Sequence, residues 1–225
     1  MSPTTTSRRP ALTPSAAALL LLLAVPAAAR AEPFAVNPEL GNSSFSAVFD
    51  AALGERINAV SSAVGCEVTV DEKTGTASGR CSVPLTSITV DNDATKSEHF
   101  RDWATNKRSD PKGCAIEATF AGVALGALAP ETPSTFAADV PFTVCGRARA
   151  DGGREHLTGT ALLLPAGSYG DKKTIRIRAT LAGFDRDAYR IGPDYTEGWL
   201  ARVQRLAKVV AKVGTVELSL FAKAK

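Results

Sequence analysis

Few side chains in this sequence have the types and spacing that catalysis requires. The chain has two histidines, His99 and His156, and no G-x-S-x-G, H-E-x-x-H or Walker motif. Asp102 follows His99 by three residues, so its carboxylate could orient the imidazole as a general base. Because no partnered nucleophile accompanies this pair, a surface ion pair or a helix cap is the favoured interpretation. We therefore expect a binding protein rather than an enzyme.

The four cysteines are the other reactive side chains, and their spacing favours disulfides over a metal site. Cys66, Cys81, Cys114 and Cys145 form no C-x-x-C pair, although structural zinc sites usually contain such closely spaced ligands. An even number of thiols that can pair is typical of proteins in oxidising compartments outside the cytosol. We expect two disulfides and no bound metal.

The first disulfide is predicted from a strand–turn–strand pattern between residues 64 and 83. If Cys66 faces Cys81, Val68 faces position 79 and Val70 faces Ala77. The apolar residues of both strands then share one face, as a half-buried hairpin requires. This agreement predicts the Cys66–Cys81 bridge.

The second disulfide, Cys114–Cys145, is expected mainly by elimination. A simple hairpin with these two residues opposite each other would turn near residues 129–130, but it places apolar side chains of one strand opposite polar ones of the other. Two geometries remain open. Either a bulge near Pro141 shifts the register by one residue, or the bridge lies in irregular chain before the strand.

Residues 1–31 have the pattern of a secretory signal peptide. A basic start is followed by an apolar run over residues 16–25 and by small residues. The run is too short to span a bilayer. We expect cleavage between Ala31 and Glu32, with a competing site after Ala29. The mature domain would then span residues 32–225 and be a soluble periplasmic or secreted protein.

The net charge of +3 comes from this same N-terminal segment. The whole chain has 26 Lys and Arg against 23 Asp and Glu, and three arginines in residues 1–31 have no acidic counterpart there. The remaining chain is therefore electrically balanced. A balanced domain offers no electrostatic argument for nucleic-acid binding.

The rest of the chain alternates between apolar and polar residues in short runs separated by turn residues. This pattern predicts an all-β protein, an antiparallel sandwich or barrel. Two segments, 93–106 and 198–213, instead show helical spacing, the first with Asp93 as a candidate N-cap. The candidate strands are 44–50, 57–70 with a break, 79–90, 114–125, 136–148, 157–164, 174–181 and 215–222.

The segment 198–213 suggests a membrane contact. Its apolar residues recur at helical spacing, and Arg202, Arg205, Lys208 and Lys212 fall on or beside the opposite face. A basic helix face can rest transiently on anionic lipid headgroups. The alternative is an ordinary solvated face above a packed apolar stripe.

Several motifs resemble those of the YceI-like family of exported lipid-binding and polyisoprenoid-binding proteins. The segment 87–92 (SITVDN), followed by 98–101 (EHFR), is similar to a strand end and short helix of that family. Further similar segments are 118–120, 142–146 and 213–220. The four cysteines and the segment around 199–213 depart from the usual pattern. The order and spacing of the motifs carry the resemblance, which covers nearly all of the mature chain.

The resemblance implies a lipocalin-like, eight-stranded antiparallel β-barrel with one or two short helices. It also implies that an apolar tunnel holds an isoprenoid, an isoprenoid quinone or a similar lipid, with no catalytic residue. A closed eight-stranded barrel either is filled by its own side chains or holds one small ligand. The alternative is therefore a stress-related structural or interaction protein with a filled core. From the alternation of the strands, the expected lipid-binding wall contains Phe120, Phe142, Val144, Ile175, Ile177, Leu218 and Leu220.

Overall fold

The computed structural model describes residues 31–106, 113–196 and 210–225. All but the last residue of the predicted signal segment therefore lies outside the described residues. The described chain forms one antiparallel sheet with an α-helix, α1 (Ala94–Thr105). The strands are β1 (Glu32–Val36), β2 (Ser44–Ala51), β3 (Arg56–Ser61), β4 (Gly65–Asp71), β5 (Thr76–Pro84), β6 (Thr89–Val90), β7 (Ala115–Ala124), β8 (Ser134–Val140), β9 (Phe142–Val144), β10 (Glu155–Leu164), β11 (Thr174–Asp185) and β12 (Val210–Ala224).

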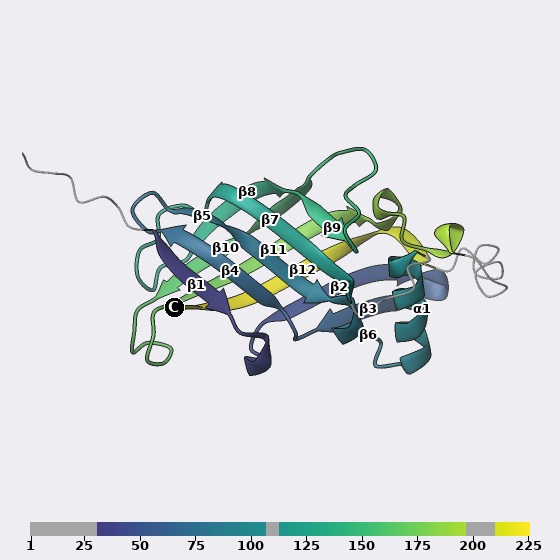
Figure 1. The fold of residues 1–225 in the computed structure, drawn as a ribbon, viewed down its shortest axis with the longest axis horizontal. Helices are drawn as coiled ribbons and strands as arrows, with labels where there is room; N and C mark the ends of the chain where they lie inside the picture. Colours follow the sequence, from purple (N-terminus) through teal and green to yellow (C-terminus); the bar gives the residue numbers. More distant parts are fainter. Residues whose placement is uncertain (1–30, 107–112, 197–209) are drawn as a thin grey trace, which may run out of the picture.

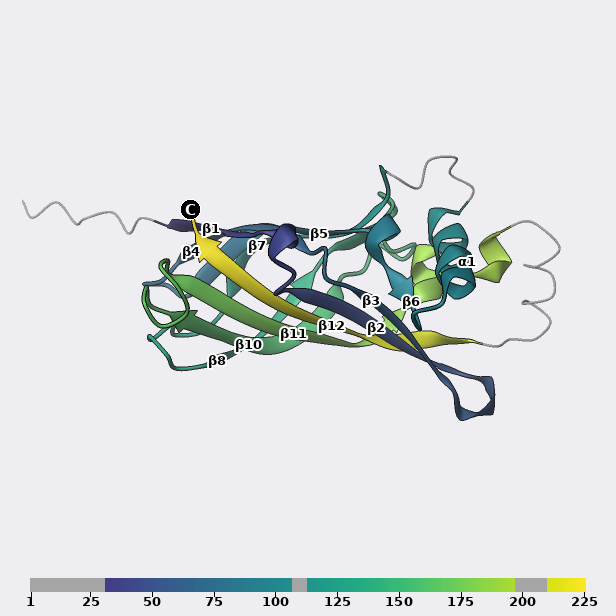
Figure 2. The same cartoon turned by 90° about the horizontal axis from the view of Figure 1, so that it is seen from below.

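Strand β12 is the centre of the sheet. On one side it pairs with β11, which continues to β10 and β8. On the other side its first half pairs with β2, followed by β3 and β6, and its last residues pair with β1, followed by β4, β5, β7 and β9. The sheet curls so that β1, β4, β5 and β7 lie over β8, β10, β11 and β12 (Figures 1 and 2). The buried apolar side chains lie between these two layers.

The all-β prediction is confirmed, but the strand count was too low. The sheet has twelve strands among the described residues, and the structure does not confirm a closed eight-stranded barrel. No pairing ladder joins β8 to β7 or β9 within the described residues. The alternating pattern merged separate strands across short breaks, and it overlooked β1, whose Phe34 and Val36 are buried.

The hairpin of β4 and β5 has the predicted register. Cys66 faces Cys81, Val68 faces Gly79 and Val70 faces Ala77. The Cys66–Cys81 disulfide is present, with the two Cα atoms 4.1 Å apart. The apolar face of this hairpin belongs to the core.

The Cys114–Cys145 disulfide is also present, but the simple hairpin around residues 129–130 was wrong. Strand β8 pairs with β10 instead of β7. Beyond Pro141 the chain returns as β9, which pairs with β7 so that Ile116 faces Val144. This register is shifted by one residue from a direct pairing of the two cysteines, and both cysteines lie just outside the ladder. Proline lacks the amide hydrogen that a continuous strand would need, which explains the break.

Helix α1 begins and ends as its sequence predicts. The Asp93 carboxylate accepts a hydrogen bond from the Lys96 amide at 2.9 Å, as an N-cap does. Asn106 ends the helix in the left-handed conformation, with φ of 46°.

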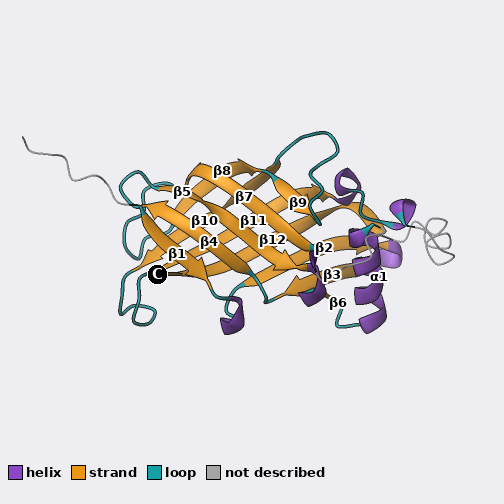
Figure 3. Ribbon diagram, in the orientation of Figure 1, coloured by secondary structure: helices purple, strands orange, loops and turns teal. Residues whose placement is uncertain are grey.

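Figure 3 shows α1 and other helical segments gathered at one end of the sheet. These neighbours include the 3-10 helices η5 (Arg186–Tyr189) and η6 (Pro193–Tyr195). Further 3-10 helices within the described residues are η1 (Pro38–Leu40), η2 (Ala52–Gly54) and η3 (Leu85–Ser87).

The second predicted helix is wrong at its C-terminal end. Residues 197–209 lie outside the described residues, but residues 210–213 begin β12. Gly214, the residue directly after the predicted helix, lies at a register shift between β12 and β2. A Cβ atom there would come within 2.4 Å of the Val48 carbonyl oxygen, so the close approach of the strands requires glycine. No helix within the described residues is long and apolar enough to cross a membrane.

Candidate functional site

A cavity of about 630 Å³ opens at the end of the sheet where α1 lies. Its wall comes from α1, from β2, β3 and β6, from β7 and β9, and from the chain between the end of β11 and the start of β12. Most of the described wall is apolar, and six of its described residues are polar. The lining residues are Phe45, Ala47, Phe49, Glu55, Ile57, Ala59, Val90, Lys96, His99, Phe100, Trp103, Ile116, Phe142, Val144, Phe184, Arg186, Ile191, Pro193, Asp194, Val210, Ala211, Lys212 and Val216.

Two small residues keep space open on the sheet side of the cavity. Ala47 on β2 faces Ala59 on β3, and both are buried. Val90 on β6 faces Ala59 from the other side. Larger side chains at these two alanines would occupy the space, because interiors pack to the density of organic crystals.

Helix α1 supplies the opposite wall. Lys96, His99, Phe100 and Trp103 are three or four residues apart and so share one helix face. The helix is fixed at its start by Ser97, whose hydroxyl accepts from the Val90 amide at 2.9 Å and donates to the Asp93 carbonyl at 2.6 Å. This contact connects α1 directly to β6.

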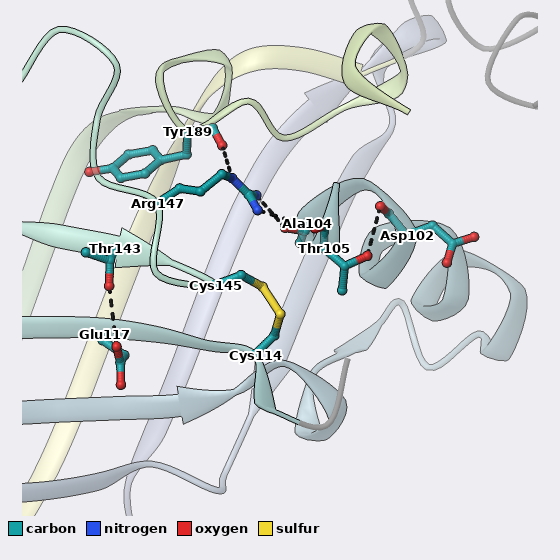
Figure 4. The surroundings of a disulfide bond; sticks show 9 residues. All are labelled: Asp102, Ala104, Thr105, Cys114, Glu117, Thr143, Cys145, Arg147 and Tyr189. Carbon is teal, nitrogen blue, oxygen red and sulfur yellow. Dashed lines mark hydrogen bonds between the residues drawn. A yellow bond between two sulfur atoms is a disulfide. The ribbon is translucent and has the colours of Figure 1, made fainter. Parts of the chain in front are cut away.

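Arg147 fixes the other end of α1 (Figure 4). Its guanidinium donates to the carbonyl oxygens of Ala104 and Thr105 at the end of the helix, and to that of Tyr189 at 3.1 Å. A cation near the carbonyl end of a helix is also favoured by the helix dipole. Because Arg147 follows the Cys114–Cys145 disulfide closely in the chain, the bridge and the arginine together hold α1 against β9 and η5.

Arg186 is the buried cation of the wall, with 9% of its surface exposed. Its Nε donates to the Ala211 carbonyl at 3.0 Å, its Nη1 to that of Ile191 at 2.6 Å and its Nη2 to that of Val210 at 3.1 Å. Gly192 makes room for the group, since a Cβ atom there would lie 2.1 Å from Nη1. Arg186 therefore ties η5 to the start of β12.

The two lysines of the wall are ion-paired. The Lys96 Nζ lies 2.7 Å from the Asp91 carboxylate, whose hydrogen bond raises the pKa of the amine. Burial opposes ionisation of Asp91, but the hydrogen bonds from Lys96 and the Asn58 amide outweigh it and lower the pKa of the carboxyl. Lys212 pairs with Asp187, and this hydrogen bond raises the pKa of the Lys212 amine.

A buried polar network lies behind the wall. The Tyr189 hydroxyl donates to the Glu155 carboxylate at 2.7 Å, and Arg149 donates to the same oxygen at 2.8 Å. Burial, followed by the hydrogen bond to Glu155, raises the pKa of the Tyr189 hydroxyl. The Tyr189 ring stacks on Phe184, with centroids 5.1 Å apart. Since Phe184 lines the cavity, this network holds one side of the wall.

Comparison with solved structures finds a polyisoprenoid binding domain from Saccharophagus degradans, described as implicated in plant cell wall breakdown. The TM-score is 0.60 at 12% identity, and the match covers 87% of this chain and 100% of that chain. The chain shares the fold of this domain. No protein-family model matches the chain, and a search of curated proteins finds no match.

The structure places the predicted wall residues in two groups. Phe142 and Val144, on β9, line the cavity. The other five are not among its lining residues, and contact of any of the seven with lipid stays a prediction. Ile175, Ile177 and Leu220 are buried elsewhere in the core, whereas Phe120 and Leu218 are partly buried and pack against it.

Most of the wall residues were not predicted from the sequence. The helical spacing of residues 93–106 predicted α1 but not that its Phe100 and Trp103 border a cavity. Arg186 carried no local signal, since its burial depends on carbonyls from distant segments. The proposed basic face of residues 198–213 lies mostly outside the described residues. Its Lys212 lies on β12 rather than on a helix.

Proposed function

We propose that the protein is an exported, non-enzymatic lipid-binding protein of the YceI-like kind that holds an isoprenoid chain. The observation that carries the proposal is the cavity of about 630 Å³ with its largely apolar, aromatic-rich wall. The shared fold with a polyisoprenoid binding domain supports it. In this proposal the ligand site is the cavity beside α1, instead of a lipocalin-like tunnel through the middle of the sheet.

The size and chemistry of the cavity suit a short isoprenoid or part of a longer one. Ligand sites typically measure about 300–1,000 Å³ and hold a drug-sized molecule. Burial of apolar surface contributes roughly 25 cal/mol per Å², so the wall attracts hydrocarbon without a charged contact. A longer polyisoprenoid would extend beyond the cavity.

The export part of the proposal rests on the N-terminal pattern and on the two disulfides. Paired cysteines fit an oxidising compartment, the periplasm or the exterior. Cleavage between Ala31 and Glu32 would leave β1 intact, with Phe34 in the core. N-terminal sequencing of the exported protein tests this site, and a cytosolic, uncleaved product would contradict export.

The lipid part is tested by native mass spectrometry and titration. The purified protein is weighed before and after organic extraction, and the extracted protein is then titrated with farnesol. We expect a removable mass of lipid size or saturable uptake of farnesol. An unliganded protein that takes up no farnesol would contradict the proposal and favour the alternative, a structural or interaction protein.

A matched pair of variants locates the binding. Ala59→Trp places a large side chain in the cavity and should weaken farnesol binding at least tenfold. Ala137→Trp adds the same side chain at an exposed position of β8 and should leave binding unchanged. Equal binding by the two variants would show that the ligand does not occupy this cavity.

A further inference from the structure

Arg186 ties η5 to the start of β12, but this role alone does not require a guanidinium to border the cavity. Removing a guanidinium from water is costly unless hydrogen bonds and an opposite charge compensate. A cavity that held only hydrocarbon would gain nothing from such a group. Arg186 nevertheless lines the cavity, beside Trp103, whose ring centroid lies 5.8 Å from the guanidinium carbon.

The contacts of Arg186 leave it with donor capacity. A guanidinium carries five N–H groups, and three of them donate to the carbonyls of Ile191, Val210 and Ala211. Nη1 also faces the Asp187 carboxylate at 3.6 Å. In the described part of the chain the Val210 carbonyl is the one acceptor recorded for Nη2, which leaves its second N–H for another partner. A ligand oxygen is the partner that this donor can take.

The charges around Arg186 favour a neutral ligand head. Asp187 lies beside Arg186 and also pairs with Lys212, while Asp91 pairs with Lys96. Glu55 and Asp194 add two carboxylates to the wall. Each cation is thus offset by a carboxylate in contact or nearby. Among the described residues, the site offers a hydrogen bond but no surplus positive charge for a phosphate or a free carboxylate.

We infer that Arg186 is the polar anchor of the cavity and donates a hydrogen bond to the oxygen of a neutral isoprenoid head. The head group, an alcohol or a carbonyl, lies at the Arg186–Trp103 side of the wall. The isoprenoid chain lies against the aromatic residues of α1 and β2, including Phe45 and Phe100. This inference rests on the proposed function and adds to it the class of head group and the residue that selects it.

Three ligands with one carbon skeleton test the head group. Farnesol, the hydrocarbon farnesene and farnesyl phosphate are titrated into the delipidated protein. A hydrogen bond to a charged group contributes about 1.5–3 kcal/mol, which corresponds to farnesol binding at least tenfold more tightly than farnesene. Farnesyl phosphate should bind no more tightly than farnesol.

The outcomes separate the inference from the proposed function. Binding of none of the three ligands would contradict lipid binding itself. Equal affinities for farnesol and farnesene would overturn the polar anchor while leaving lipid binding in place. Tenfold tighter binding of farnesyl phosphate than of farnesol would overturn the neutral head.

Substitution of Arg186 tests whether this residue causes the preference for farnesol over farnesene. Arg186→Gln should lower the affinity for farnesol to that for farnesene and leave the farnesene affinity unchanged. A merely structural role would lower both affinities together. Arg178→Gln changes an exposed arginine of β11 and should retain the full preference for farnesol. If Arg186→Gln does not fold, the comparison of the three ligands on the wild-type protein still tests whether the cavity has a polar anchor.

Discussion

The two ends of the sheet are built from the same alternating strands but differ in their interiors. At the end near β1, Phe34 lies between its strand partners Val68 on β4 and Ala224 on β12, and both Phe34 and Ile175 are fully buried. At the end near α1, the same sheet surrounds a cavity of about 630 Å³. We call these the filled end and the hollow end. The comparison shows that alternation alone does not determine whether a β interior is filled.

Side-chain size and the closing element account for the difference. At the filled end, Ile175 lies opposite Leu163 and Ala222 on neighbouring strands, so large and small residues complement each other. At the hollow end, two alanines, Ala47 and Ala59, face each other. A helix closes this end in place of further strands, and its side chains line the space instead of filling it.

The largest expected effect comes from removing each disulfide. Cys66→Ser/Cys81→Ser should cost about 3 kcal/mol of unfolding free energy, and Cys114→Ser/Cys145→Ser somewhat more, because the second bridge closes a longer loop. Denaturant unfolding measures both losses.

Ligand binding distinguishes the two bridges. Removal of Cys114–Cys145 should weaken farnesol binding, since this bridge holds β7 and β9, which carry Ile116, Phe142 and Val144. Removal of the Cys66–Cys81 disulfide should leave farnesol binding unchanged. Equal loss of binding in both variants would contradict a division between the two ends.

Enlarging one alanine at each end should give opposite results. Ala222→Phe overpacks the filled end and should destabilise the protein by about 1–3 kcal/mol without preventing binding in the folded fraction. Ala59→Phe enters the cavity and should change stability by less than ~1 kcal/mol but weaken farnesol binding. Thermal unfolding and titration check the pair, and equal destabilisation by both would mean that the cavity is not available space.

The smallest effect concerns an ion pair at the filled end. Lys173 Nζ contacts Glu32 at 2.8 Å and Glu72 at 2.7 Å, and the Lys173 hydrogen bond lowers the pKa of the Glu32 carboxyl against the effect of burial. A lowered carboxyl pKa stabilises the fold above the unfolded-state pKa, and this stabilisation is lost as the pH falls through the folded-state pKa.

Lys173→Met should therefore cost a few tenths of a kcal/mol at neutral pH, because the pair is partly exposed. The difference from wild type should disappear in acid, below the folded-state pKa of Glu32. Urea unfolding as a function of pH measures it. Farnesol binding should be unaffected at neutral pH, and a loss there would contradict the separation of the two ends.

The structural features that depend on local contacts were predicted correctly from local sequence patterns. The register of β4 and β5 followed from the apolar face shared with Cys66 and Cys81, and α1 followed from the Asp93 cap and the spacing of its apolar residues. The helix predicted over residues 198–213 was wrong where β12 begins, because the spacing of Val210 and Val213 fits a helix as well as a strand. Only the pairing of Val210 with Ala51 and of Val213 with Asp185 decides between them.

The site was less predictable than the fold, because a cavity depends on residues that are distant in the sequence. Phe142 and Val144 were expected in the wall, but the pattern gave equal weight to Ile175 and Leu220, which lie in the core away from the lining. Arg186 likewise could not be predicted as a wall residue from its local sequence. Arginine is typical of surfaces, and its burial follows from the carbonyls of Val210 and Ala211.

The most direct test of the account is photo-crosslinking with a diazirine-bearing farnesol analogue, mapped by peptide mass spectrometry. We predict labelling at the hollow end, on peptides that contain Phe100, Trp103 or Phe142, and loss of that labelling when unmodified farnesol competes. Competable labelling at Ile175 or Leu220 would contradict the claim that the cavity beside α1 is the lipid site. Labelling that farnesol does not reduce would contradict specific binding altogether.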